Sequence, residues 1–189
     1  MTRDEHRVPD LLAPGLDLVF CGTAPSPASF KAQAYYANPG NAFWPTLHAV
    51  GLTPERLPPR RYPELLNWRL GLTDLNKTEV GSDHELSAHA MDAKALHAKL
   101  RKYRPAAVAF TSKNAAALAL GRRAPAYGRQ PEPLEGAIDR RLEALDSPRI
   151  GSGDDQERRV ALGIDGRTNL LAHLGGLDDR LAIEMPASL

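Results

Sequence analysis

Hydrophobic residues gather in two short runs, and each run ends where polar, turn-forming residues begin. Leu16-Asp-Leu-Val-Phe-Cys21 is followed by Gly22, and Ala106-Ala-Val-Ala-Phe110 is followed by Thr111-Ser-Lys-Asn114. A short apolar run bounded by turn residues is typical of a strand buried inside a sheet. The pattern therefore predicts buried strands over 16–21 and 106–110.

Helical spacing follows each of these runs. Residues 41–50 place apolar side chains three or four positions apart, with Asn41 as the expected N-cap. Ser82-Asp-His-Glu85 fits a capping box, which predicts a helix from there to about Tyr103. An alanine- and leucine-rich run predicts another helix over 115–120. The alternation of strands, loops and helices favours an α/β fold with a parallel sheet.

Three predicted loops lie at the same edge of this sheet: 22–29, 35–41 and 111–114. Residues 23–29 are expected to be a loop because two prolines lie two positions apart. Gly71-Leu-Thr-Asp-Leu75 is interpreted as a further loop. Open α/β sheets usually bind ligands at the carboxyl ends of their strands, so a site is expected at this edge.

Composition changes near residue 130, although the 189 residues carry a net charge of only +1. Residues 1–130 contain 17 Lys or Arg and 11 Asp or Glu, a balance of +6. Residues 131–189 contain 7 and 12, a balance of −5, and every aromatic residue lies at or before Tyr127. A basic surface is expected on the first part. Hydrophobic periodicity weakens beyond Gly136, and no strand is predicted after residue 137.

A single cysteine, Cys21, excludes an internal disulfide and favours a reducing compartment. It closes a buried strand, so a packed thiol is expected. No apolar run approaches the roughly 18–20 residues of a membrane span, and residues 1–10 lack the apolar stretch of a signal peptide. A soluble cytoplasmic protein is the expectation. His84, His89 and His97 lack the i, i+4 spacing of metal ligands, so a solvated helix face is expected.

Four motifs occur in order along the first 130 residues. They are Val19-Phe-Cys-Gly22, Tyr36-Ala-Asn-Pro-Gly-Asn-Ala-Phe-Trp44, Gly71-Leu-Thr-Asp-Leu75 and Tyr127-Gly-Arg-Gln130. They resemble the F-C-G-I-N-P-G, F-A-H-P-x-N-x-F-W, G-[VF]-T-[KN]-[LM] and W-G-K-Q patterns of the mismatch-specific uracil/thymine DNA glycosylases, within the uracil-DNA glycosylase superfamily. The resemblance implies a three-layer α/β/α fold with a central, mainly parallel four-stranded sheet. It also implies hydrolysis of the N-glycosidic bond of a damaged base in DNA, with no metal or organic cofactor.

The resemblance also suggests roles for individual residues. Tyr36 lies where the family has an aromatic that stacks on the flipped base, with core packing as the alternative. The loop that would contact and shape the base pocket consists of Gly22, Thr23, Ala24, Pro25 and Ser26. Ser112 is expected to donate a hydrogen bond to the base. Candidates for DNA contacts are Lys113, Arg56, Arg60, Arg61, Arg122, Arg123 and Arg129; a solvated surface charge is the alternative for each arginine.

One departure from the family bears directly on the chemistry. Ala24 stands where the family has the asparagine of G-I-N-P-G that positions water, and an alanine side chain cannot hold water. Asn41 is therefore the first candidate for orienting water, as in related hypoxanthine/uracil glycosylases, with helix capping as its alternative role. Asp74 is the second, because a carboxylate can act as a base or stabilise an oxocarbenium-like sugar. A turn or capping aspartate is the alternative for Asp74.

The family's last motif has no clear counterpart here. The family has a strand and then a P-S-x-S/G loop that enters the DNA stack, whereas Asp146-Ser-Pro-Arg-Ile-Gly-Ser152 has suitable residue types without a preceding strand. We therefore predict a glycosylase-like core over 1–136 and an atypical acidic segment over 137–189. That segment is either a divergent extension or is translated out of the ancestral frame.

Together these features favour a monomeric DNA-repair hydrolase that excises uracil or a related deaminated base from single- or double-stranded DNA. A catalytically weak or inactive DNA-damage binding module on the same fold is the alternative, which Ala24 and the missing last motif both favour. A hydrolase of small-molecule nucleosides is a further alternative.

Overall fold

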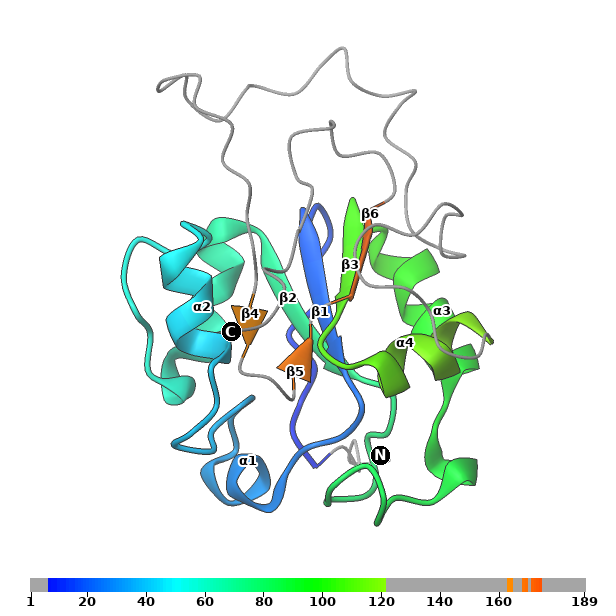
Figure 1. Ribbon diagram of the computed structural model, residues 1–189. Coiled ribbons are helices and arrows are strands. Elements are labelled where there is room, and N and C mark those ends of the chain that lie inside the picture. Colours follow the sequence, from blue (N-terminus) through cyan, green and yellow to red (C-terminus); the bar gives the residue numbers. More distant parts are fainter. Residues whose placement is uncertain (1–6, 122–162, 165–167, 170, 175–189) are drawn as a thin grey trace, which may run out of the picture.

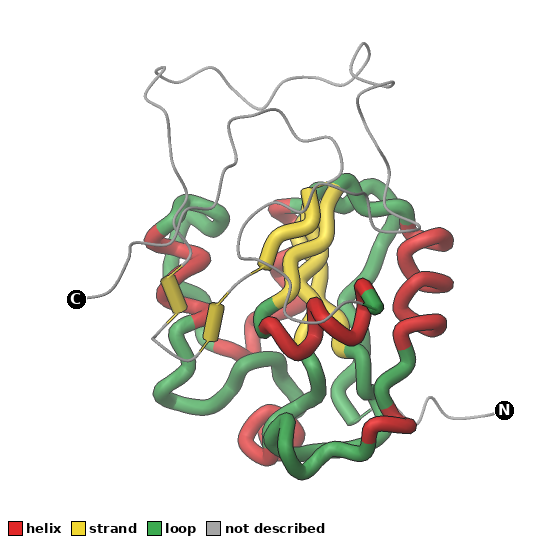
Figure 2. The backbone as a smooth tube through the Cα atoms, turned by 45° about the vertical axis from the view of Figure 1, so that its right-hand side comes forward, coloured by secondary structure: helices red, strands yellow, loops and turns green. Residues whose placement is uncertain are grey.

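A parallel sheet forms the centre of the computed structural model, which describes residues 7–121, 163–164, 168–169 and 171–174 (Figure 1). Strand β1 (Leu18–Gly22) lies between β2 (Leu70–Asp74) and β3 (Ala107–Phe110), and both pairings are parallel. Figure 2 shows the strands, in yellow, side by side at the centre of the described part of the chain. Every residue of these three strands is buried, which explains their largely apolar sequences. The predicted α/β fold with a parallel sheet is confirmed, including the strands expected near 16–21 and 106–110.

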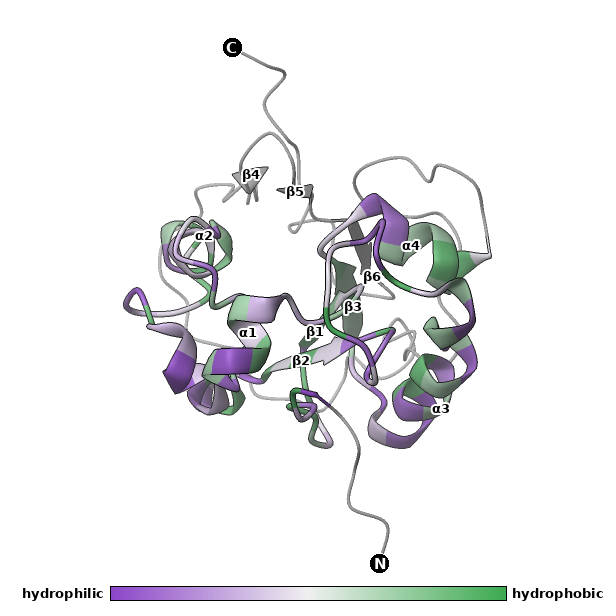
Figure 3. Cartoon of the chain, turned by 90° about the horizontal axis from the view of Figure 1, so that it is seen from below, coloured by the Kyte–Doolittle hydropathy of each residue, from purple (hydrophilic) through white to green (hydrophobic). Residues whose placement is uncertain are grey.

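Helices cover both faces of the sheet. The helix α2 (Phe43–Ala49) and the 3₁₀ helix η1 (Pro59–Trp68) pack on one face, and α3 (Ala93–Tyr103) and α4 (Lys113–Leu120) on the other; Figure 3 shows α2 opposite α3 and α4. The helix α1 (Pro27–Ala32) follows β1 and lies beyond the carboxyl end of that strand (Figure 1). A short 3₁₀ turn, η2 (Ala88–Ala90), precedes α3. Among the helices of the described residues, none combines the length and apolar composition that a membrane-spanning helix needs.

The two faces of β1 supply two hydrophobic cores, because successive side chains of a strand point to opposite sides. Phe20 packs with Phe43 of α2, their rings edge to face with centroids 5.1 Å apart. Cys21 faces the other way and packs with Leu96 and Leu100 of α3. The buried thiol confirms that Cys21 is a packed side chain.

Strand β2 was not predicted; its residues were interpreted as a loop. Gly71 and Asp74 are both unfavourable in strands, so the sequence pattern did not indicate a strand here. Gly71 is needed because the chain passes close by: a Cβ atom there would lie 2.8 Å from the Leu11 carbonyl oxygen and 2.6 Å from Leu16 Cδ1. Asp74 therefore ends a buried strand and does not belong to a surface loop, which corrects that prediction.

Strands after residue 137 were not predicted either. The structure has β4 (Gly163–Ile164), β5 (Thr168–Asn169) and β6 (Leu171–Leu174). β6 pairs antiparallel with β3, which gives the order β2-β1-β3-β6, and β4 pairs with β5. These strands are two to four residues long, too short to produce a clear periodicity in the sequence.

Helix α1 begins inside the segment that was predicted to be a loop. Pro27 is its first residue, where a missing N–H has no intrahelical partner to lose. Ser26 caps the helix, because its hydroxyl oxygen accepts a hydrogen bond from the Ser29 N–H at 3.2 Å. The two prolines therefore restrict where the helix begins but do not prevent it.

Helix α3 begins at Ala93, eleven residues later than the predicted capping box. The Glu85 carboxylate does accept the Ser82 N–H at 2.7 Å, but the pair closes a turn and no helix follows it. Asp92 caps α3 instead by accepting the Ala95 N–H at 2.7 Å. A capping-box pattern thus produced the predicted side-chain contact without the predicted helix.

Candidate active site

The carboxyl ends of β1 and β2 bring three polar groups around Gly22. Gly22 and Asp74 are directly paired in the register of the two strands. A Cβ atom on Gly22 would lie 2.5 Å from Asp74 Oδ1, 3.2 Å from the Tyr36 hydroxyl and 3.6 Å from Thr111 Oγ1. Because glycine has no side chain, these oxygens can converge on its backbone. This is the edge of the sheet where the sequence predicted a site.

Asp74 is the buried acid of this site. The residue is 3 % exposed, and among the described residues Oδ2 has no hydrogen-bond partner. Burial raises its pKa from 3.8 to about 6; Lys77 and Lys99 oppose this rise and Asp10 adds to it. A carboxyl group with a pKa near 6 is mostly ionised at neutral pH, yet it can still accept a proton, as general base catalysis requires.

Tyr36 is fixed beside Asp74 in an unusual backbone conformation. Its φ angle is +52°, in the left-handed region that residues other than glycine rarely adopt. Its ring stacks on Phe43, with centroids 4.0 Å apart and an interplanar angle of 25°. Its hydroxyl donates to Thr111 Oγ1 at 3.2 Å. Burial, and then Asp74, raise the pKa of this phenol well above its usual value, so it stays neutral.

The hydroxyl groups of Thr23 and Ser112 connect the loops that follow β1 and β3. Their oxygens lie 3.1 Å apart, and the Thr23 carbonyl accepts the Asn76 N–H at 2.8 Å. Ser112 also caps α4, because its hydroxyl oxygen accepts the Ala115 N–H at 3.0 Å. Ser112 therefore has a structural role in addition to any contact with a base.

The remainder of the predicted pocket loop is partly inaccessible. Pro25 is buried, and its carbonyl accepts the Gly81 N–H at 3.1 Å. Ala24 is half-buried and presents only a methyl group, while Ser26 caps α1. The loop thus contributes backbone and small side chains to the edge of the site.

Asn41 lies in a surface cavity whose lining includes Tyr36 but not Asp74. The cavity has a volume of about 350 Å³. Its lining consists of Tyr36, Ala37, Asn38, Pro39, Asn41, Trp44, Arg56, Leu57, Pro58 and Pro59. Asn41 Oδ1 accepts the Phe43 N–H at 2.9 Å, although Ala42, not Asn41 as predicted, is the N-cap of α2. This bond leaves the Asn41 amide NH₂ group for a ligand. Among the described residues, no hydrogen bond joins Asn41 to Asp74.

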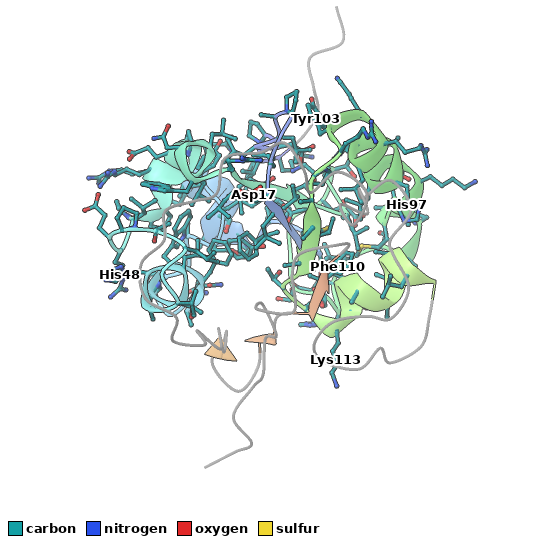
Figure 4. All side chains as sticks on the ribbon, turned by 90° about the horizontal axis from the view of Figure 1, so that it is seen from above. Asp17, His48, His97, Tyr103, Phe110 and Lys113 are labelled. Atoms are coloured by element: carbon teal, nitrogen blue, oxygen red, sulfur yellow. The ribbon has the colours of Figure 1, made fainter. Side chains whose placement is uncertain are left out.

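The residues predicted to contact DNA have different surroundings. Lys113 projects from the beginning of α4 (Figure 4), and Arg60 is exposed in η1. The Arg61 guanidinium group donates to both carboxylate oxygens of Glu64, at 2.6 and 2.7 Å, and lies 2.9 Å from Glu55 Oε1. These acids compete with phosphate for Arg61, so Arg60 is the better placed of the two neighbouring arginines.

Some predictions fall outside the described residues. They concern Arg122, Arg123 and Arg129 and the segment 146–152. The division of the chain at residues 136 and 137 also stays a prediction.

A buried lysine behind Asp74 was not predicted from the sequence. Lys77 is 7 % exposed, and its Nζ donates to the Val8 carbonyl at 2.6 Å and to the Tyr35 hydroxyl at 2.9 Å. The same Nζ lies 2.9 Å from Asp10 Oδ1 and 3.8 Å from Asp74 Oδ2. The i, i+3 spacing of Asp74 and Lys77 was the one local sign of this pairing.

Asp10 connects this lysine to helix α3. Its Oδ2 lies 2.6 Å from Lys99 Nζ, and its Oδ1 accepts the Thr73 hydroxyl at 2.8 Å. Burial would raise the pKa of Asp10, but Lys77 and Lys99 together hold it below the ordinary value. We call Asp10, Asp74, Lys77 and Lys99 the charged cluster. Its members come from distant parts of the sequence, so no local motif could reveal it.

Metal coordination has no evident basis here: within the part of the chain that the structure describes, His, Cys, Asp and Glu side chains form no group of three or more that could hold a metal ion.

The fold and site thus define an α/β protein with an acid and an aromatic ring at the carboxyl ends of its parallel strands. A family model described as the uracil DNA glycosylase superfamily matches residues 9–165. This match covers most of the chain, and the chain belongs to this superfamily. Membership confirms the superfamily resemblance, and it supports a DNA glycosylase type of function with DNA as the partner.

Proposed function

We propose that the protein is a DNA glycosylase that hydrolyses the N-glycosidic bond of uracil or a related deaminated base in DNA. The observation that carries this proposal is the buried Asp74 carboxylate in a chain of this superfamily: its Oδ1 lies beside Gly22, and its Oδ2 has no hydrogen-bond partner among the described residues. Within the superfamily, the motifs favour the mismatch-specific uracil/thymine glycosylases. We also propose the three-layer arrangement with a four-stranded central sheet for the complete domain.

The proposed reaction begins with a base that has left the DNA stack, at a cost of a few kcal/mol. The base lies against the Tyr36 ring, whose other partner, Phe43, holds it in place. Water attacks C1′ of the sugar while the electron pair of the glycosidic bond leaves with the base. Asp74 accepts the proton of the water and stabilises the positive charge that develops on the sugar. The products are a free base and an abasic site.

We assign the reacting role to Asp74 and a binding role to Asn41, which reverses their order as candidates. The Asn41 carbonyl oxygen already accepts the Phe43 N–H, which occupies one of its two lone pairs and fixes the amide for its structural role. An amide is also a far weaker base than a carboxylate whose pKa is about 6. The free NH₂ group of Asn41 can instead donate to an oxygen of the base or of the DNA backbone.

DNA binding in this proposal rests on exposed cations at the edge of the site. Lys113 and Arg60 are exposed, and Arg56 is exposed at the rim of the cavity. Contacts of this kind bind phosphates without reading sequence, and they weaken as salt rises. We further propose a monomeric, cytoplasmic protein.

The experiment is an excision assay on single- and double-stranded oligonucleotides that contain one uracil, followed by alkaline cleavage of abasic sites. We expect strand breaks at the uracil with the wild-type protein and none with Asp74→Asn. Asp83→Asn is the matched control, because Asp83 is an exposed acid outside the charged cluster, and it should leave excision unchanged. Equal excision by Asp74→Asn and wild type would contradict the assignment of Asp74.

A DNA-damage binding module without catalysis is the second candidate. Ala24 favours it, since the loop beside Gly22 offers no polar side chain at that position. Tight binding of uracil-containing DNA without release of uracil, measured with the same oligonucleotides, would support this function. If the protein instead released bases from free nucleosides and did not bind DNA, the small-molecule alternative would apply.

A further inference from the structure

The hydrogens of the Lys77 ammonium group are fully used by groups other than Asp74. An ammonium group has three N–H donors and no acceptor. The Val8 carbonyl, the Tyr35 hydroxyl and Asp10 Oδ1 accept them, at 2.6, 2.9 and 2.9 Å. None is left for Asp74 Oδ2, which lies 3.8 Å away and has no hydrogen-bond partner in the part of the chain that the structure describes. Lys77 therefore offers Asp74 a positive charge without a hydrogen bond.

This arrangement bears on how a buried catalytic carboxylate stays ionised. Burial favours the neutral acid, and a nearby cation is needed to favour the carboxylate. A cation that also donates a hydrogen bond would occupy the lone pairs that must receive a proton. In this protein the ammonium group of Lys77 forms an ion pair with Asp10 Oδ1, and Lys99 Nζ forms an ion pair with Asp10 Oδ2.

We propose that Lys77 is a positioning residue that keeps Asp74 ionised by its charge alone, while Asp10 and Lys99 hold its hydrogens away from the Asp74 carboxylate. This inference rests on the proposed function of Asp74. It adds three residues that the sequence analysis did not identify.

The charges that face Asp74 come from every element packed against it. Lys77 lies in the loop after β2, Lys99 on α3 and Asp10 in the segment before β1. The other titratable neighbours are Cys21, Tyr35 and Tyr36. Burial, together with Asp74 itself, raises the pKa of each well above its usual value, so all three are neutral. Two cations, Lys77 and Lys99, therefore balance two carboxylates, Asp10 and Asp74. Removal of any one charge is expected to change the ionisation of the others.

The inference makes predictions of opposite sign for two substitutions. Lys77→Met removes the nearest cation, so the pKa of Asp74 should rise by roughly one to three units. Asp10→Asn removes the nearby anion, so the pKa of Asp74 should fall. A merely structural role for the cluster would give both variants the same loss of stability and no opposed change in titration.

The test is a ¹³C NMR titration of the full chain labelled at the Asp side-chain carboxyl carbons. Asp74→Asn identifies the Asp74 resonance by its disappearance. The matched control is Lys99→Met, which removes a cation that contacts Asp10 and not Asp74, so its upward shift should be smaller than that of Lys77→Met. Opposite shifts in Lys77→Met and Asp10→Asn support the inference. An Asp74 pKa unchanged in both, or displaced in the same direction, overturns it.

The pH dependence of excision then separates this inference from the proposed function. The acid limb of the rate profile should move to higher pH in Lys77→Met and to lower pH in Asp10→Asn, in step with the titration. If Asp74 titrates as expected but excision is absent from wild type, the inference about Lys77 holds and the proposed function fails. Should Lys77→Met not fold, Asp10→Asn alone decides: an Asp74 pKa that does not fall overturns the inference.

Discussion

Two polar regions flank Tyr36, and they are built in different ways. The charged cluster has Asp74 and Lys77 buried at its centre, carries four compensating charges and joins three distant parts of the chain. The cavity at Asn41 is open to solvent, and its polar groups come from consecutive loops. Tyr36 belongs to both, because its hydroxyl lies near Gly22 and Asp74 and the residue also lines the cavity.

This difference in burial indicates that the two regions have different roles. Burial changes the protonation behaviour of a side chain, so chemistry that moves a proton is expected in the cluster. A solvated amide keeps ordinary properties but can donate hydrogen bonds to a ligand at little desolvation cost. The structure therefore favours reaction at Asp74 and recognition at Asn41, and each prediction below tests that separation.

The largest expected effect is on the rate constant of excision. Asp74→Asn should lower kcat by about 10²–10⁴-fold, as loss of a general base does, with little change in DNA affinity. Asn41→Ala should mainly raise KM, by about tenfold or less, because one hydrogen bond is lost. Single-turnover rates and DNA binding measured on both variants would decide. A larger loss of rate in Asn41→Ala than in Asp74→Asn would reverse the two roles.

A methyl group at position 22 should damage the Asp74 region and spare the cavity. Gly22→Ala places an atom 2.5 Å from Asp74 Oδ1, so the strand or the carboxylate must move. We expect a loss of about 1–3 kcal/mol in the free energy of unfolding, together with a loss of excision. The control is Gly40→Ala at the cavity loop, where the nearest atom would be 4.0 Å away. Equal urea denaturation curves for wild type and Gly22→Ala would show that Asp74 does not pack tightly against Gly22.

Stability should depend on pH through Asp74. Its pKa of about 6 in the folded chain exceeds the ordinary value of 3.8, so between these values the native chain holds a proton that the unfolded chain releases. The stability contributed by this group is complete below pH 3.8 and is lost as pH rises through about 6. The loss amounts to about 3 kcal/mol, and Asp74→Asn should remove it. Thermal melts should show that the melting temperature of Asp74→Asn increases relative to that of the wild type as pH rises from acid to neutral. A difference in melting temperature that does not change with pH would contradict the raised pKa of Asp74.

The smallest effects should come from surface cations. Lys113→Ala and Arg60→Ala should each weaken DNA binding modestly and reduce its salt dependence by about one counterion. Arg61→Ala should change DNA binding less, because two glutamates already neutralise this guanidinium group. Binding isotherms over a range of salt concentrations measure both quantities. A larger effect for Arg61 would mean that its ion pairs open on DNA.

Short-range patterns predicted much of the fold correctly. Strands β1 and β3 were evident because their residues are apolar and both end at turn formers. Strand β2 was missed because Gly71 and Asp74 are depleted from strands, and they occur there for reasons of close packing and chemistry. The capping box at Ser82 produced its local contact but not a helix, since a helix also needs a buried face to pack.

The candidate site was predictable only in part. Tyr36, Gly22 and Asp74 were identified from motifs, and the structure brings all three together. The roles of Lys77 and Asp10 were not accessible, because the pair spans 67 positions and neither residue lies in a recognised motif. Such long-range charge pairs depend on how the sheet folds, and no spacing rule along the sequence encodes them.

The left-handed backbone of Tyr36 has a consequence for the thermodynamics of substrate capture. Such a conformation costs on the order of 1–3 kcal/mol, and it persists because the surrounding contacts determine it. That cost is met when the chain folds, before any DNA arrives. The ring is therefore already oriented when a base leaves the duplex, and little further rotational entropy of the protein needs to be lost at that moment.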